Sequence, residues 1–235
     1  MKPTRWLDKA NVAIEGIIYS VKTQRHMRYH LAAALGVLLV SLVVNITRTE
    51  FILLCLAIIL VLVTEMLNTA IEVAVDMISE AYHPKAKIAK DIAAGVVLMA
   101  SIGALILAYL ILYPAIREAL VTGFWPVRKA PNDVIAFVSF AIVVIVVVII
   151  KALLGTGEPL RGGMPSGHAA VSFSLWVASI YLSRSLPLIA IVFLLAVIVS
   201  WSRWSSGVHR PREVFAGAFL GAGLTLLLFL LFSHE

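Results

Sequence analysis

Two polar segments interrupt the apolar second half of the chain, and their side chains are of the kinds that hold and cleave a phosphate ester. The first, residues 151–168, is rich in glycine and ends at His168, and the second, residues 202–213, contains His209. Imidazole is nucleophilic near neutral pH, and guanidinium, ammonium and backbone amide groups bind phosphate oxygens. We therefore expect a hairpin to bring the two segments to one end of a helix pair and to form a phosphatase site there.

A second set of polar side chains lies on one long apolar stretch in the first half. Its members are Glu65, Asn68, Glu72 and Asp76. Their spacing, i, i+3, i+7 and i+11, places them within roughly 80° of one another on a helix. Carboxylates at membrane depth are costly unless a cation, a proton or a substrate offsets their charge. This acidic stripe fits a divalent-metal site or a general base for a hydroxyl. Simple pairing with the lysines of residues 85–90 is the alternative, and it suits Asp76 better than Glu65.

The elements that must position these residues are membrane helices. Hydrophobic residues make up 61% of the 235 residues, charged residues 14%, and the mean hydropathy is +1.01. Together with the length of the apolar runs, these values predict an all-α polytopic membrane protein with about seven spans. The predicted spans are residues 29–46, 51–80, 92–113, 134–150, 169–182, 186–201 and 214–232. Residues 6–24 mix apolar and charged side chains, as expected for a helix lying in the membrane interface.

A polar, proline-rich segment at residues 114–132 marks the predicted linker between two domains. The first domain, residues 1–113, contains the interfacial helix and three spans, and the second, residues 133–235, contains four spans. The one cysteine, Cys55, excludes an intrachain disulfide. The basic residues flank the predicted spans and form no nucleic-acid signature.

The distribution of Lys and Arg predicts the topology. With the N-terminus on the cytoplasmic side, the alternating segments place 14 basic residues inside and five outside, which satisfies the positive-inside rule. This assignment puts both polar segments of the second domain on the cytoplasmic face. The excess of basic residues on the inside becomes smaller when the Lys and Arg residues of the two polar segments of the second half are discounted. The orientation of the second domain therefore stays open, and it depends on whether residues 114–132 re-enter the membrane.

Residues 65–76, EMLNTAIEVAVD, and residues 82–95, YHPKAKIAKDIAAG, resemble the signature of the prokaryotic diacylglycerol kinase and undecaprenol kinase family. The resemblance covers roughly residues 4–113. It implies a homo-oligomer, a trimer in that family, with ATP and Mg²⁺ as cofactors in sites between subunits. By this resemblance Glu65 takes the proton from the lipid hydroxyl and Glu72 binds the divalent metal. The residues implied to line the nucleotide site are Arg5, Asn68, Asp76, Lys90 and Asp91.

The chain departs from this family at Gln24. The family has a glutamate there, which shares the metal with the residue matching Glu72, whereas this chain has an amide. The Gln24 carbonyl can still coordinate Mg²⁺, but without a charge. Kinase activity is therefore expected to be weakened or lost.

The polar segments of the second half resemble the three motifs of the type 2 phosphatidic acid phosphatase superfamily, over roughly residues 134–232. The matching residues are Lys151, the run Pro165-Ser166-Gly167-His168, and Ser202-Arg203 followed by His209. By this resemblance His209 attacks phosphorus to give a phosphohistidine, and His168 protonates the departing oxygen. The implied phosphate ligands are Lys151, Arg203 and the amides around Ser166 and Gly167. No metal is implied.

Two departures from the superfamily pattern occur near the expected site. Glu213 stands where the nucleophilic histidine usually has an aspartate partner, which adds one methylene. Glu158 stands where the first motif usually has an arginine, and an anion there repels phosphate. We expect Arg161, three residues further on, to supply the missing guanidinium.

These observations predict a fusion enzyme of membrane lipid phosphate metabolism, in the cytoplasmic membrane of a prokaryote. Phosphorylating a polyprenol such as undecaprenol and removing one phosphate from its diphosphate both yield the polyprenyl monophosphate. Diacylglycerol is the other expected kinase substrate. The alternative is a phosphatidic acid or phosphatidylglycerophosphate phosphatase beside an inactive kinase-like domain. In that case the first domain is only an oligomerisation and lipid-presenting scaffold.

Overall fold

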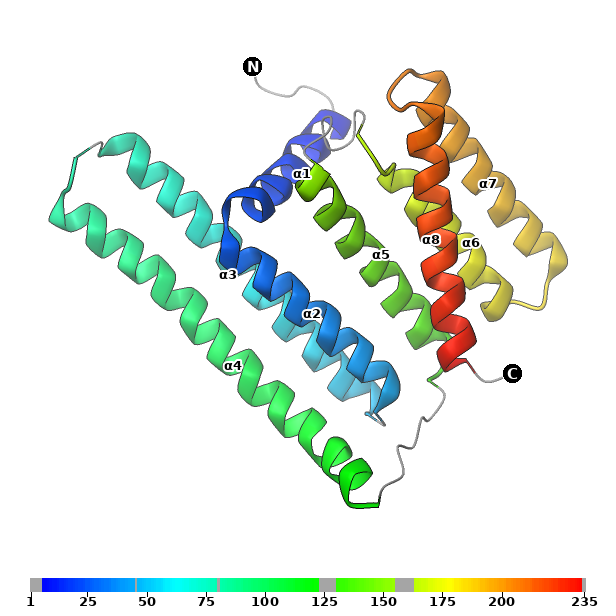
Figure 1. Ribbon diagram of the computed structural model, residues 1–235, viewed down its shortest axis with the longest axis horizontal. Helices are drawn as coiled ribbons and strands as arrows, with labels where there is room; N and C mark the ends of the chain where they lie inside the picture. The colour runs from blue at the N-terminus through cyan, green and yellow to red at the C-terminus, as the bar shows by residue number, and fades with distance from the viewer. Residues whose placement is uncertain (1–5, 45, 80, 123–129, 155–162, 234–235) are drawn as a thin grey trace. The chain divides into compact units, whose positions relative to one another are not determined.

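The computed structural model describes residues 6–44, 46–79, 81–122, 130–154 and 163–233, which form eight helices and no strand (Figure 1). Six of the described helices are long and apolar enough to cross a membrane. The prediction of an all-α polytopic membrane protein is therefore confirmed. Of the seven predicted spans, the one at residues 169–182 is not among these six. It forms α6 (Gly167–Leu182), which has 16 residues. At 1.5 Å per residue it is about 24 Å long, shorter than a typical hydrocarbon core.

The chain divides into two compact units, Thr23–Val127 and Met1–Lys22 with Arg128–Glu235. The second unit includes α1 (Trp6–Thr23) up to Lys22. That α1 lies in a membrane interface stays a prediction. The predicted domain limits at residues 113 and 133 also stay a prediction.

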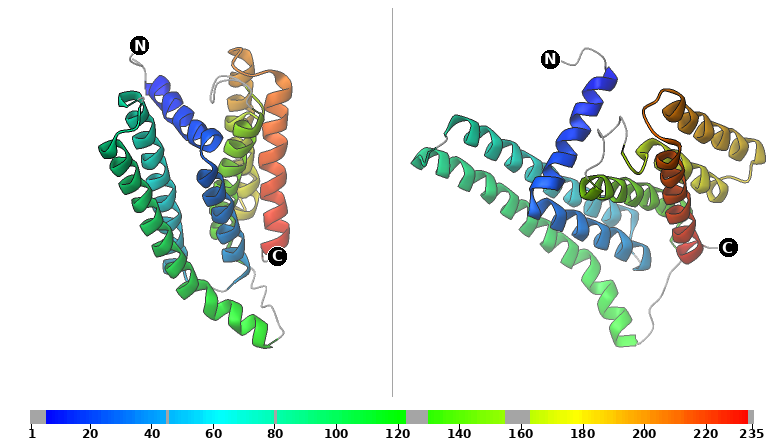
Figure 2. Two further views of the ribbon diagram at one scale, coloured as in Figure 1. Left: turned by 60° about the vertical axis from the view of Figure 1, so that its left-hand side comes forward. Right: turned by 45° about the horizontal axis from the view of Figure 1, so that its top comes forward.

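The first unit consists of α2 (Arg25–Val43), α3 (Arg48–Ile78) and α4 (Pro84–Thr122), with α3 lying beside α4 (Figures 1 and 2). Thr47 begins α3 with a capping box, because its hydroxyl accepts from the Glu50 amide at 3.3 Å and the Glu50 carboxylate accepts from the Thr47 amide at 2.6 Å.

Helix α4 continues through Pro114 to Thr122, so the first part of the predicted linker is helical. The polar and proline-rich composition of residues 114–122 does not end the helix. A proline ends a helix only when its lost hydrogen bond and its ring clash are not accommodated, and here the helix accommodates both.

The second unit contains α5 (Asn132–Leu154), α6, α7 (Leu186–Ser205) and α8 (Pro211–Phe232). Helix α6 contacts all three of the others, and its contact with α8 is the most extensive (Figure 1). Both polar segments of the second half therefore meet where α6 and α8 begin.

Two glycines of α8 allow it to approach the backbone of α6 directly. A methyl group on Gly221 would lie 1.9 Å from the carbonyl oxygen of Ala170, and one on Gly217 would lie 2.3 Å from that of Ser166. Both distances are far shorter than any van der Waals contact. The four-residue spacing on each helix puts these contacts in register along one seam, in the manner of small-residue packing between membrane helices.

The seam continues with a polar contact and ends in a stack of two aromatic rings. Thr225, four residues after Gly221, shares a hydrogen bond of 2.7 Å with Ser174, and both side chains are buried. At the far end the ring of Tyr181 stacks on that of Phe229, with centroids 4.2 Å apart. Hydroxyl pairing removes the cost of burying either group alone, so the helices are held along their full common length.

Substitution along this seam should separate two glycines of the same helix. We expect Gly221→Ala to lower the free energy of unfolding by about 1–3 kcal/mol, because its new methyl group meets backbone that cannot move aside. Gly223→Ala, where a methyl group meets nothing within 4 Å, is the matched control and should leave stability unchanged or slightly raised. Thermal unfolding of both variants in detergent checks this. Equal shifts in the two variants would contradict the close packing.

Candidate functional site

The turn between α7 and α8 places His209 against the end of α7. Gly207 adopts a left-handed conformation (φ 69°), and its amide donates to the Trp204 carbonyl at 2.9 Å. The chain then folds back, so that the His209 amide donates to the carbonyl of Arg203 at 3.0 Å. Only glycine adopts this φ without strain. The motif residues Arg203 and His209 are therefore joined through the main chain.

His209 is held by a carboxylate through one ring nitrogen and is open at the other. Its Nδ1 lies 2.9 Å from Oε2 of Glu213, and the same oxygen accepts from the Arg210 amide at 3.3 Å. The ring is 4% exposed, and its Nε2 is buried with no hydrogen-bond partner in the described part of the chain. A ring that donates from Nδ1 has its lone pair at Nε2, which is the arrangement of a nucleophilic imidazole.

Five further buried side-chain polar atoms in the described ranges lack a partner, and two of them, Ser166 Oγ and Arg203 Nε, belong to residues predicted to bind phosphate. Buried polar atoms in native proteins are nearly always paired, so each exception calls for an explanation. Two N–H or O–H donors beside a nucleophile are what an oxyanion requires. The open Ser166 and Arg203 donors therefore fit an anion beside His209.

The backbone of Ser166 plays a different part from the one expected. Its amide was predicted to hold phosphate, but it donates to the main-chain carbonyl of Glu213 at 2.9 Å. This bond ties the start of α6 to the first turn of α8. The hydroxyl of Ser166 is therefore the group that is open to a ligand, while Gly167 is the first, half-buried residue of α6.

Lys151 and His168 belong to the same cluster. Lys151 is buried in the last turn of α5, and His168 is half-buried in the first turn of α6. Burial, followed by the charges of Arg203, His209 and Lys151, lowers the pKa of His168 from 6.5 to about 4. The charges of Arg203, His209 and Lys151 therefore act on His168, as expected for side chains that lie near one another.

Burial also lowers the pKa of His209 below its ordinary value, although the hydrogen bond that its ring donates to Glu213 acts in the opposite direction. His209 is therefore neutral at pH 7, as a nucleophile must be. A bound phosphate anion raises the pKa of a neighbouring histidine. His168 is thus suited to take up a proton when a substrate arrives.

The predicted roles of Arg161 and Arg5 lie outside the described residues, as does the position of Glu158. The other predicted residues of the second half come together as described above. The Gly217–Gly221 spacing, which fixes the start of α6 against α8, was missed from the sequence. Its small-x-x-x-small pattern within an apolar run is the signal that could have revealed it.

The acidic stripe of the first unit follows one face of α3 with a gradient of burial. Glu65 is 2% exposed and Asn68 8% exposed, while Glu72 is half-buried and Asp76 exposed. Asp76 forms an ion pair with Lys90 of α4 at 2.5 Å. The stripe therefore runs from the interior of the first unit to its polar end.

The carboxylate of Glu72 is held by two amides. Gln24 Nε2 donates to one of its oxygens at 3.0 Å, and Asn68 Nδ2 donates to the other at 3.1 Å. Asp91, predicted to belong to the nucleotide site, forms an exposed ion pair with Lys87 at 3.8 Å. The described part of the structure thus joins five of the predicted kinase residues by direct contacts, whereas Asp91 pairs with Lys87, which was not among them.

An apolar cavity of about 200 Å³ lies between α2, α3 and α4. Val61, one helical turn before Glu65, is part of its wall, and His30 and Ser101 are its polar members. Ser101 Oγ is buried and has no partner among the described residues. A mostly apolar cavity with a few polar groups is typical of a site for an amphipathic molecule.

Comparison with known proteins finds two families in this chain. The prokaryotic diacylglycerol kinase family matches residues 11–112, and the PAP2 superfamily matches residues 154–235. No solved structure matches the chain significantly.

Two curated relatives resemble part of the chain. The diacylglycerol kinase of Synechocystis sp. (strain ATCC 27184 / PCC 6803 / Kazusa) is 37% identical over 107 residues, which are 45% of this chain and 61% of that protein. The undecaprenol kinase of Bacillus subtilis (strain 168) is 39% identical over 99 residues, which are 42% of this chain and 80% of that protein. The chain therefore spans less than two thirds of the first relative and most of the second.

The titration of the two histidines should reveal the electrostatics of the site. His209 should gain its proton only below pH 6.5, and Glu213→Gln should move that titration lower still, because the carboxylate raises the pKa of His209. Lys151→Met should raise the pKa of His168, since the ammonium charge helps to hold it low. Side-chain NMR of the histidines measures both. With Lys87→Met as control, unchanged titrations in all variants would refute a shared site.

Proposed function

The chain belongs to the prokaryotic diacylglycerol kinase family, to which a PAP2 superfamily domain is joined at residues 154–235, and from this premise we propose that it hydrolyses a lipid phosphate or diphosphate at His209. The observation that carries the proposal is the His209 ring, fixed by Glu213 at Nδ1 and buried but unpartnered at Nε2. The two families support a role in lipid phosphate metabolism, and the six apolar helices and bacterial relatives support a multi-pass bacterial membrane protein.

In the proposed mechanism, Lys151, Arg203 and the Ser166 hydroxyl hold the phosphate oxygens. Nε2 of His209 attacks phosphorus, the bond from phosphorus to the leaving oxygen breaks, and His168 gives its proton to that oxygen. Glu213 holds the Nδ1 proton and stabilises the positive charge that the ring acquires. Water, deprotonated by His168, then releases inorganic phosphate from the phosphohistidine and restores both histidines.

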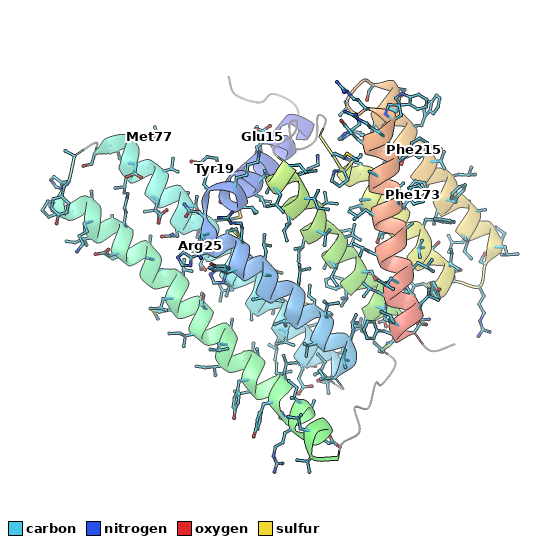
Figure 3. The ribbon with its side chains drawn as sticks, viewed as in Figure 1. Glu15, Tyr19, Arg25, Met77, Phe173 and Phe215 are labelled. Carbon is cyan, nitrogen blue, oxygen red and sulfur yellow. The ribbon has the colours of Figure 1, made fainter. Side chains whose placement is uncertain are left out.

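The surroundings of the site favour a substrate at the membrane surface. Trp201 and Trp204 flank Arg203 at the end of α7, with ring centroids 4.9 Å apart, and are 60% and 46% exposed. Phe215, in the first turns of α8, is 65% exposed and projects outward (Figure 3). Exposed Trp residues at helix ends are typical of the interface between membrane and water. A phosphate carried on a lipid reaches such a site directly.

We propose polyprenyl diphosphate as the phosphatase substrate. If the two halves acted on one lipid and its monophosphate, they would consume ATP in a cycle. Hydrolysing the diphosphate and phosphorylating the free polyprenol both produce the same monophosphate, so the two reactions add to one pool. The printed name of the Bacillus subtilis relative, an undecaprenol kinase, supports a polyprenyl lipid. Phosphatidic acid or phosphatidylglycerophosphate is the alternative substrate.

The second candidate function is lipid phosphorylation by the first unit, which Glu65 favours. A carboxylate that is 2% exposed, one turn from an apolar cavity, suits a base for the hydroxyl of undecaprenol or diacylglycerol. The family generally uses ATP and a divalent metal. We propose that the chain acts as a homo-oligomer, as a trimer if it follows the family, with its N-terminus cytoplasmic.

The phosphatase proposal predicts distinct losses at two residues. His209→Ala should lower kcat by at least about 10⁴-fold because no phosphohistidine forms. Glu213→Gln should lower it by about 10²–10⁴-fold because the imidazolium loses its stabilising charge. Release of phosphate from undecaprenyl diphosphate, undecaprenyl phosphate and phosphatidic acid measures both, with the exposed Arg184→Ala as control. Ready release from the monophosphates, with the diphosphate untouched, would rule out the proposed substrate.

The kinase candidate is tested in the His209→Ala background, so that no product is hydrolysed. Transfer of labelled γ-phosphate from ATP to undecaprenol or diacylglycerol should disappear in Glu65→Gln, since the hydroxyl then has no base. Thin-layer separation of the lipids identifies the product. If Glu65→Gln leaves every activity unchanged, the first unit is a scaffold and not a kinase.

A further inference from the structure

Two amides donate hydrogen bonds to the carboxylate of Glu72 in the first half, while the carbonyl oxygen of one of them, Asn68 Oδ1, is buried without a partner among the described residues. Gln24 stands at the start of α2, just before Arg25, and its Nε2 donates to Oε2 of Glu72 at 3.0 Å. Asn68, one turn earlier on α3, donates to Oε1 at 3.1 Å. Each oxygen of a half-buried carboxylate therefore has a neutral N–H donor. A carboxylate that accepts such bonds remains stable in its charged form without any cation.

This arrangement does not fit a divalent metal. Mg²⁺ requires oxygen ligands in near-octahedral geometry, and proteins usually bind it through one or two carboxylates together with waters and substrate phosphates. Both side chains that contact the Glu72 carboxylate present N–H groups to it, and these carry partial positive charge. In the described ranges, no group of three or more His, Cys, Asp or Glu side chains is close enough to hold a metal ion.

We infer that the Gln24 amide takes the place of a divalent cation beside Glu72, so that the first unit has no metal site in its resting state. The residue type at position 24 determines whether such a site exists. The Gln24 amide presents its nitrogen, not its oxygen, to the Glu72 carboxylate. The same group therefore cannot give its carbonyl to a cation held by Glu72 unless it first breaks this bond. The sequence-based prediction that the Gln24 carbonyl coordinates Mg²⁺ is not supported by this orientation.

The charge at residue 24 explains why this one position matters. Two carboxylates facing each other at this distance repel unless a cation lies between them, whereas an amide and a carboxylate attract. Gln24→Glu would convert a self-sufficient pair into one that needs a cation. The inference concerns metal binding by the first unit, so it opposes the kinase candidate, whose family generally uses a divalent metal. It is independent of hydrolysis at His209.

The test measures the binding of Mn²⁺, without nucleotide, to the whole chain in detergent. We expect the wild-type protein to bind it weakly and to show no change in Tm between EDTA and Mn²⁺. Gln24→Glu should bind at least about tenfold more tightly, unfold at a lower temperature in EDTA and recover with Mn²⁺. Paramagnetic resonance of free Mn²⁺ gives the affinity, and thermal unfolding gives the stability.

Two further variants make the result decisive. Gln24→Glu combined with Glu72→Gln should lose the gain, which assigns the new site to the pair. Gln24→Ala should leave the weak binding of the wild type unchanged. The inference is overturned if Gln24→Glu gains no affinity, or if the wild type already binds tightly and Gln24→Ala weakens it. If the Gln24→Glu variant does not fold, the wild type and Gln24→Ala still test the inference. Equally weak Mn²⁺ binding in these two proteins supports the inference, and Mn²⁺ binding by the wild type that Gln24→Ala abolishes overturns it.

Discussion

The direct backbone contact between α6 and α8 is the constraint on which the second half depends. The carbonyls of Ser166 and Ala170 occupy the space that side chains at Gly217 and Gly221 would fill. The same approach allows the Ser166 amide to reach the carbonyl of Glu213. Helix packing and site geometry therefore depend on each other, because Glu213, which holds His209, lies in the first turn of the helix whose next turns form the seam.

Both halves place charged groups within largely apolar helices, and they offset the charge in different ways. In the second half, cationic side chains lie beside a carboxylate and leave buried donors open, which prepares the site for an anion. In the first, Glu72 is satisfied by neutral amides. Buried charge always requires compensation. An open set of donors indicates a ligand that comes and goes, whereas a closed set indicates a stable resting state.

The sequence was sufficient for features that depend on local pattern. Length and hydropathy predicted the membrane helices, and the spacing of Lys151, His168 and His209 predicted a cluster that the fold brings together. It was insufficient where tertiary contacts decide. Nothing local shows that the Ser166 amide turns to α8, or which atom of the Gln24 amide faces Glu72, 48 residues away. The α4 helix continues past Pro114 for the same reason, since neighbouring contacts outweigh local propensity.

Two hydrogen bonds join the end of α8 to the start of the second half. The Ala130 amide donates to the carbonyl of Phe232 at 2.9 Å, and the Ser233 hydroxyl donates to the Asn132 side chain at 2.8 Å. The segment from residue 130 to residue 233 therefore starts and finishes at the same place. A segment with adjacent ends can be joined to another protein at a single point without stretching either partner. A partner joined ahead of residue 130 then leaves intact the hydrogen bonds that hold the two ends together.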